Sequence, residues 1–153
     1  MQAERTATVT REVRIAATPE TIFAFFTDPV KLMRWKGVAA SLDATPGGEF
    51  RVDVTPRDVV VGEYVEVDPP KRIVFTWGWE GSAEVPPGTS TVEITLTPDG
   101  DETVVTLVHS GIPEPAAPVH AQGWDHFLPR LAIAAAGGDP GPDPYVDHPE
   151  GGM

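Results

Sequence analysis

The spacing of large apolar side chains changes once along this chain, and the change limits the folds it can adopt. From about residue 48 to residue 110 they recur at every second position, the repeat of strands that bury one face. From His120 onward they recur at every third or fourth position, the repeat of one helix face. The residues on that face are Trp124, Leu128, Leu131 and Ala135. A helix that follows strands must bury its stripe on the sheet, so the sequence predicts a sheet packed against a long C-terminal helix.

Turn and capping signals divide the rest of the chain. Residues 7–16 alternate polar and apolar side chains and predict a first strand. Thr18-Pro19 and Asp28-Pro29 each place a capping side chain before a proline at the first helical position, which predicts two short helices. Later apolar alternations, separated by Pro/Gly turns, predict further strands at 38–44, 50–54, 59–67, 73–79, 92–96 and 104–109.

This order favours an α+β fold, in which a curved antiparallel sheet of about six to seven strands grips the C-terminal helix. Such a curve can enclose a cavity for a small molecule. Pro129 cannot donate to the carbonyl of Asp125, so we expect a kink or an early break in the helix, at a cost of about 3 kcal/mol. The domain is expected over 7–136, after an N-terminal extension 1–6 and before a Pro/Gly-rich acidic tail, 137–153, predicted to be disordered.

Composition excludes several classes of function. A net charge of −12 without a basic cluster makes nucleic acid an unsuitable partner. The absence of cysteine excludes disulfides, thiolate catalysis and cysteine-ligated metals. No run of 18 apolar residues is present, so we expect no membrane insertion. The N-terminus lacks a secretory pattern, which favours a cytoplasmic protein, and the Ala-, Gly-, Pro- and Arg-rich composition is typical of a GC-rich bacterial genome.

Several segments together carry a family resemblance. They are the helix pair from Thr18 to Trp35, the turn Gly47-Gly-Glu-Phe50-Arg, the stretch from Gly62 to Trp77, the strands from Ser90 and Thr103, and Gly123-Trp124 with Leu128 and Leu131. Over about residues 8–136 the chain resembles the SRPBCC (START-like, helix-grip) superfamily, in the branch of activator of heat-shock-protein ATPase homologues. The resemblance implies a helix-grip fold. Members include co-chaperone domains, polyketide cyclases and lipid carriers, so the fold by itself does not give a function.

Aromatic side chains are the first candidates for a binding site. Trp77 and Trp79 share one face of a strand, and Trp124, Phe127 and Leu128 lie on the closing helix. These residues can stack on a planar ligand, or they can fill the core, and the two roles look the same in a sequence.

Three polar residues are candidates for ligand orientation or acid–base chemistry. Glu63 falls among the apolar positions of its strand, where an inward carboxylate would have a raised pKa, unless a bulge turns it outward. His109 ends the last strand and His120 begins the helix, so either can act as a base, or each can simply satisfy a local backbone group. No third ligand joins them, so neither a metal nor another cofactor is expected.

The sequence therefore favours a small-molecule binding protein, with an apolar or aromatic ligand of lipid or polyketide type held between sheet and helix. One alternative is a cyclase or hydrolase that uses Glu63, His109 or His120 as general base. The other is a co-chaperone-like domain that binds a protein. Nothing specifies the oligomeric state, and a homodimer stays open.

Overall fold

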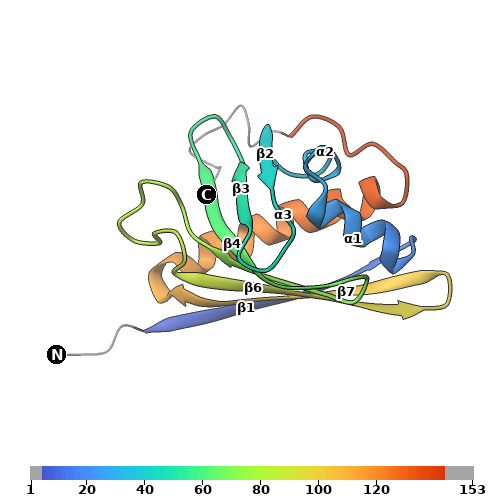
Figure 1. Ribbon diagram of the computed structural model, residues 1–153, viewed down its shortest axis with the longest axis horizontal. Coiled ribbons are helices and arrows are strands. Elements are labelled where there is room, and N and C mark those ends of the chain that lie inside the picture. Colours follow the sequence, from blue (N-terminus) through green and yellow to red (C-terminus); the bar gives the residue numbers. More distant parts are fainter. Residues whose placement is uncertain (1–4, 144–153) are drawn as a thin grey trace.

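Seven antiparallel strands form one sheet in the order β1-β7-β6-β5-β4-β3-β2. The computed structural model describes residues 5–143. The sheet curves, and the long helix α3 lies against its inner side, with α1 and α2 at one end (Figure 1). The strands are β1 (Thr6–Ile15), β2 (Ala39–Leu42), β3 (Glu49–Asp53), β4 (Val59–Asp68), β5 (Arg72–Trp77), β6 (Ser90–Asp99) and β7 (Glu102–Pro113), and the helices are α1 (Pro19–Thr27), α2 (Pro29–Leu32), the 3-10 turn η1 (Glu114–Ala116) and α3 (Ala117–Ala135). The predicted α+β architecture is confirmed.

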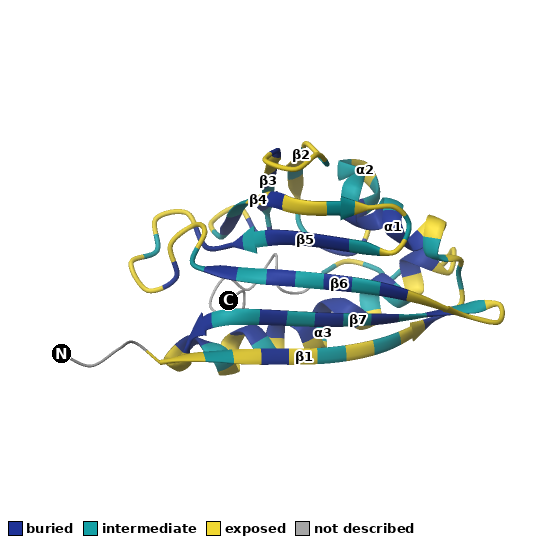
Figure 2. Ribbon diagram, turned by 60° about the horizontal axis from the view of Figure 1, so that its bottom comes forward, coloured by how far each residue is buried: buried dark blue, intermediate teal, exposed yellow. Residues whose placement is uncertain are grey.

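The two short helices begin where the capping signals predict. The side chain of Thr18 accepts from the Thr21 amide at 3.2 Å, and that of Asp28 accepts from the Val30 amide at 2.9 Å. Along β6 and β7, buried residues alternate with more exposed ones (Figure 2), because one face of each strand packs on the core. No helix in residues 5–143 is long and apolar enough to span a membrane.

The last carbonyls of α1 receive side-chain donors from other elements. A helix leaves its final carbonyl groups without backbone partners, and buried ones need other donors. Trp35 Nε1 donates to the carbonyl of Phe25 at 3.1 Å, and the Tyr64 hydroxyl donates to that of Phe26 at 2.8 Å. Burial raises the pKa of Tyr64, so the hydroxyl keeps its proton. These bonds fix α1 to β4 and to the residues that follow α2.

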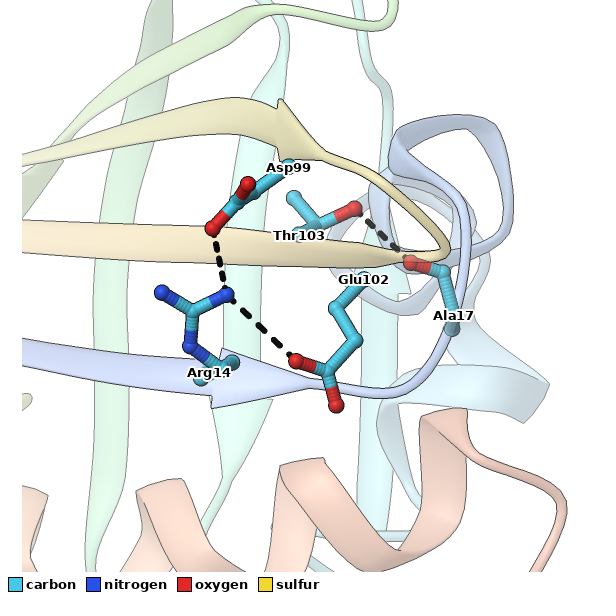
Figure 3. A network of polar contacts seen from close by, with 5 residues as sticks. All are labelled: Arg14, Ala17, Asp99, Glu102 and Thr103. Atoms are coloured by element: carbon cyan, nitrogen blue, oxygen red, sulfur yellow. Dashed lines mark hydrogen bonds and ion pairs between the residues drawn. The ribbon is translucent and has the colours of Figure 1, made fainter.

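Ion pairs connect the edge strand β1 to the turn between β6 and β7. Arg14 on β1 pairs with Asp99 at 2.6 Å and with Glu102 at 3.4 Å, while the Thr103 hydroxyl donates to the carbonyl of Ala17 at 2.7 Å (Figure 3). The β6–β7 turn is thereby tied to β1 and to the chain that enters α1.

The early break expected at Pro129 is wrong, because α3 continues to Ala135. Pro129 and Asp125 are both exposed, so water can solvate the carbonyl that loses its helical donor. Beyond Pro129, Leu131 and Ala134 are buried against the sheet, and their burial offsets the cost of the missing hydrogen bond.

The part of the predicted tail that the structure describes, residues 137–143, makes defined contacts with α3. Arg130 donates to the carbonyls of Pro140 at 3.3 Å and Gly141 at 2.9 Å, and His126 lies 2.7 Å from the Asp143 carboxylate. These bonds attach residues 137–143 to α3. Residues 144–153 and 1–4 lie outside the described part of the chain.

The Tyr64 bond leads to a stability prediction. Tyr64→Phe leaves the buried carbonyl of Phe26 without this donor, so the free energy of unfolding should fall by about 1–3 kcal/mol in urea denaturation. Thr27→Val is the control, because its half-buried hydroxyl bonds back to Phe23 within the same helix, and it should cost less than about 0.5 kcal/mol. Equal losses in the two variants would contradict the assigned role of Tyr64.

Candidate functional site

Two buried histidines join α3 to the sheet through tryptophan side chains. Trp124 Nε1 on α3 donates to His109 Nδ1 on β7 at 3.0 Å. Trp79 Nε1, just beyond β5, donates to His120 Nε2 on α3 at 3.0 Å. The two imidazole rings lie edge to face, with centroids 5.3 Å apart. The structure thus brings the two predicted histidines and two of the predicted tryptophans into one cluster.

The hydrogen bonds fix which nitrogen of each histidine carries the proton. An indole N–H can only donate, so His109 Nδ1 and His120 Nε2 must be acceptors. The His109 Nε2–H therefore donates to Ser90 Oγ at 2.8 Å, and Ser90 in turn donates to the carbonyl of Trp77 at 3.0 Å. The His120 Nδ1–H donates to the carbonyl of Ala116 at 2.8 Å. Both ring lone pairs are engaged, which leaves neither histidine ready to accept a substrate proton.

The surroundings keep both imidazoles neutral. Burial lowers the pKa of His109 to about 2, with smaller contributions from His120 and from the charge of Lys36. Burial also lowers the pKa of His120, against an opposing effect of its bond to the Ala116 carbonyl. His120 satisfies a local backbone group, the Ala116 carbonyl, whereas His109 bonds to the side chains of Ser90 and Trp124. Neither arrangement suits a general base. Among residues 5–143, no three metal-ligating side chains come together.

Lys36 is a functional candidate that the sequence did not indicate. Its ammonium nitrogen lies 4.4 Å from the ring centroid of Trp77, 4.3 Å from that of Trp124 and 4.6 Å from that of Phe127. We call these three rings the aromatic cage. Lys36 is 4% exposed, and its Nζ has no hydrogen-bond partner among the described residues. Burial lowers its pKa to about 7, although the charge of Asp143 opposes the shift.

The residues on both sides of Lys36 are held in place. Trp35 before it is held by its bond to α1, and the carbonyl of Trp35 accepts from Arg130 at 3.1 Å. Gly37 after it has a φ of 93°, and a Cβ there would lie 2.9 Å from the carbonyl oxygen of Asp53. In the sequence, a lysine between a short helix and a glycine looks like a surface residue. The local features at this position are the flanking Trp35 and Gly37, and they do not indicate whether the Lys36 side chain points into the core or into solvent.

The cavity expected between sheet and helix is filled by side chains. Trp77, Trp124, Phe127 and Leu128 are all buried in the core. An open pocket of about 390 Å³ lies instead at the N-terminal end of α3, where Trp79 and His120 form part of its wall. The other lining residues are Arg57, Asp58, Val59, Glu80, Gly81, Ser82, Glu84, Val85, Pro115, Ala116 and Val119.

Glu63 is exposed, so of the two directions that the sequence left open the strand takes the outward one. Three residues of β4 are buried, Val59, Val60 and Tyr64, whereas Glu63, directly before Tyr64, is exposed. The register shifts between Tyr64 and Glu66, where the strand has a bulge. Both faces of β4 carry valines, so alternation could not tell which set packs inward. Glu63 therefore takes no part in the pocket or in the histidine cluster.

Comparison with known proteins identifies relatives over most of the chain. A model of the family described as Activator of Hsp90 ATPase homolog 1-like protein matches residues 16–136. The human activator of 90 kDa heat shock protein ATPase homolog 1 is 28% identical over 123 residues, which are 80% of this chain and 35% of that protein. The chain thus spans about a third of the length of this curated relative.

Two solved structures are similar in both fold and sequence. An AHSA1-like protein from Rhizobium etli is 42% identical, with a TM-score of 0.74, over 95% of this chain and 92% of that chain. DynU16, a protein in the dynemicin biosynthetic locus, is 29% identical, with a TM-score of 0.75, over 87% of this chain and 48% of that chain.

The buried lysine leads to a prediction about stability and pH. Between pH 7 and 10.5 the unfolded chain keeps a proton on Lys36 that the folded chain has lost, so the folded protein gains stability as the pH rises. Lys36→Met removes this difference at similar volume. It should raise the free energy of unfolding on the order of 2–4 kcal/mol at pH 7, and the gain should vanish by about pH 10.5. A variant that is less stable at pH 7, or a gain that does not change with pH, would show that Lys36 is not buried as a destabilised charge.

The histidine bonds predict two opposite tautomers. In ¹⁵N–¹H correlation spectra, His109 should carry its proton on Nε2 and His120 on Nδ1. His109 should stay neutral from pH 8 down to pH 5, because burial lowers its pKa to about 2, and His120 should gain a proton only below the ordinary imidazole pKa near 6.5. A ring that titrates near pH 6.5, or one with the other tautomer, would contradict the bonding described above.

Proposed function

The chain belongs to the family of Activator of Hsp90 ATPase homolog 1-like proteins, and on that premise we propose that it binds a small, planar, largely apolar molecule. The observation that carries the proposal is the pocket of about 390 Å³ beside Trp79 and His120. Its volume falls within the range of known small-molecule sites, about 300–1,000 Å³.

One wall of the pocket is an aromatic ring held in a fixed orientation, and other parts of its lining are aliphatic. Trp79 is anchored through its Nε1 to His120, so its ring keeps one orientation and a ligand need not order it on binding. Val59, Val85 and Val119 supply aliphatic contact. A flat ring fits such a surface, since it stacks on the indole while its edges contact the valines.

Charged residues at the pocket add polar selectivity. Asp58, Glu80 and Glu84 line it together with Arg57, so acidic groups outnumber basic ones. Glu80 pairs with Arg51 at 2.8 Å, and Asp58 accepts from the Thr55 hydroxyl at 2.9 Å. These carboxylates are suited to hydroxyl or amine groups on the ligand rather than to acidic ones.

The same geometry favours binding over catalysis. A cyclase or hydrolase needs a base with a free lone pair within reach of the substrate. At His120 that lone pair accepts the hydrogen bond from Trp79 Nε1. His109 is fully buried and does not line the pocket. The similarity to DynU16, from the dynemicin biosynthetic locus, supports a small molecule as the ligand.

A chaperone partner is the second candidate function. It is favoured by the 28% identity with the human heat-shock-protein activator, although this chain covers 35% of that protein. Binding of a heat-shock protein would use the outer surface rather than the pocket, so pocket variants separate the two candidates.

A thermal-shift screen with aromatic polyketides, flavonoids, fatty acids and sterols tests the proposal. A ligand at 100 times its Kd stabilises by about 2.7 kcal/mol, on the order of 5–10 °C for a domain of this size. Val119→Arg places a bulky charge in the pocket and should raise the Kd of the best ligand at least about tenfold, an effect of about 1.4 kcal/mol.

Ile133→Arg is the matched control. Ile133 lies on the same helix with nearly the same exposure, 46% against 44% for Val119, and it does not line the pocket. The Kd of the Ile133→Arg variant for the same ligand should equal that of the unchanged protein. Equal losses in the two variants, or no shift with any compound, would overturn the pocket as a binding site. A pull-down with a purified heat-shock protein then tests the second candidate.

A further inference from the structure

The Lys36 side chain has features of a reactive amine that the proposed function does not use. We propose that Lys36 captures small aldehydes as an imine inside the aromatic cage of Trp77, Trp124 and Phe127. This site is separate from the open pocket, so it does not depend on what the pocket binds.

The cage encloses the amine without committing it to a partner. All three ring centroids lie within 4.6 Å of Nζ, and no described residue offers it a hydrogen bond. An ammonium group has three donors to satisfy, and the ring faces offer their electrostatic attraction alone. A neutral amine has fewer unmet donors and loses less solvation on burial. Its nitrogen lone pair is then free to attack a carbonyl carbon.

Charges around the cage also allow the neutral form. Desolvation lowers the pKa of Lys36 to about 7, and Asp143 of segment 137–143 opposes the shift. His109 on β7 and His120 on α3 face the same interior and are neutral, as their lowered pKa values require. At pH 7 the amine is therefore free of its proton in about half of the molecules, whereas an exposed lysine with a pKa near 10.4 is neutral in fewer than about one in a thousand.

The chemistry of imine formation balances within the site. The Nζ lone pair attacks the carbonyl carbon, and one N–H proton of the amine passes to the carbonyl oxygen as the carbinolamine forms; the second N–H proton leaves with that oxygen as water. Loss of water then leaves a C=N bond to Lys36, with no oxidant or reductant required. The imine is flat and has lost the N–H donors of the amine, so it suits contact with aromatic faces better than an ammonium ion does.

A second unmet donor in the cage supports a carbonyl compound. Trp77 Nε1 is buried and has no hydrogen-bond partner among residues 5–143. Its ring face also contacts the lysine nitrogen, at 4.4 Å from the centroid. An oxygen acceptor is what this donor lacks, and the aldehyde and the carbinolamine each bring one until that oxygen leaves as water. Because the cage is closely packed and Lys36 is 4% exposed, the aldehyde must be small.

Reductive methylation of the native protein tests the proposal. The probe is formaldehyde with cyanoborohydride at pH 7, and mass spectrometry of peptides gives the rate at each lysine. The chain has three lysines, Lys31, Lys36 and Lys71, so two serve as internal controls. Lys36 should be methylated at least about tenfold faster than the other two, with a rate that levels off above about pH 7. In urea, the three rates should become similar.

Two variants make the result specific. Lys36→Met should abolish the fast modification and leave the rates at Lys31 and Lys71 unchanged. Asp143→Asn removes the charge that favours the ammonium form, so the pH at which the Lys36 rate is half maximal should move down. Methylation of Lys36 no faster than that of Lys31 and Lys71 in the native protein would overturn the proposal. That outcome is independent of the thermal-shift result for the pocket.

Discussion

Two buried indole N–H groups, those of Trp79 and Trp124, donate to histidines, and these bonds hold α3 to the sheet. Trp124 and His109 connect α3 to β7, while Trp79 and His120 connect the end of β5 to the start of α3. An N–H left without a partner in the interior costs on the order of 1–3 kcal/mol, so each bond opposes separation of helix and sheet. The histidines serve this purpose as neutral rings, and their burial keeps them neutral.

The tryptophan–histidine bonds lie where the closed interior meets the open pocket. His120 belongs to both, because one nitrogen accepts from Trp79 and the ring also lines the pocket. A ligand therefore meets a surface that is already fixed by internal bonds. Lys36 lies on the other side of Trp77, in the closed interior, where burial makes its amine unusually easy to deprotonate. The proposed binding at the pocket and the proposed reactivity at Lys36 both depend on the same packed aromatic side chains.

Much of the fold could be predicted from local patterns. The capping residues Thr18 and Asp28 start α1 and α2 as expected, because a side-chain acceptor followed by proline satisfies a helix start with little help from the rest of the chain. Alternation predicted the strands, but at β4 it left open which face Glu63 takes. Valines stand at both odd and even positions there, and the packing of Tyr64 against α1 decided between them.

The candidate site was harder to predict, for a physical reason. A sequence shows that His109, His120 and the tryptophans are near the core, but the hydrogen bonds between them join residues as many as 41 positions apart. Lys36 carries no local signal, since its burial depends on Trp77, Trp124 and Phe127, which lie far from it in the chain. The 137–143 segment has the composition of a disordered tail, and its contacts depend on Arg130 of a helix that must already be in place.

The sequence alone therefore determined the elements, their order and the apolar faces, because periodicity and capping act over a few neighbouring residues. Tertiary structure alone decided which side chains fill the space between sheet and helix, where the open pocket lies, and which titratable groups lose their charge. Those outcomes depend on distances between residues far apart in the chain. They also depend on desolvation, which exists only once the whole interior has closed.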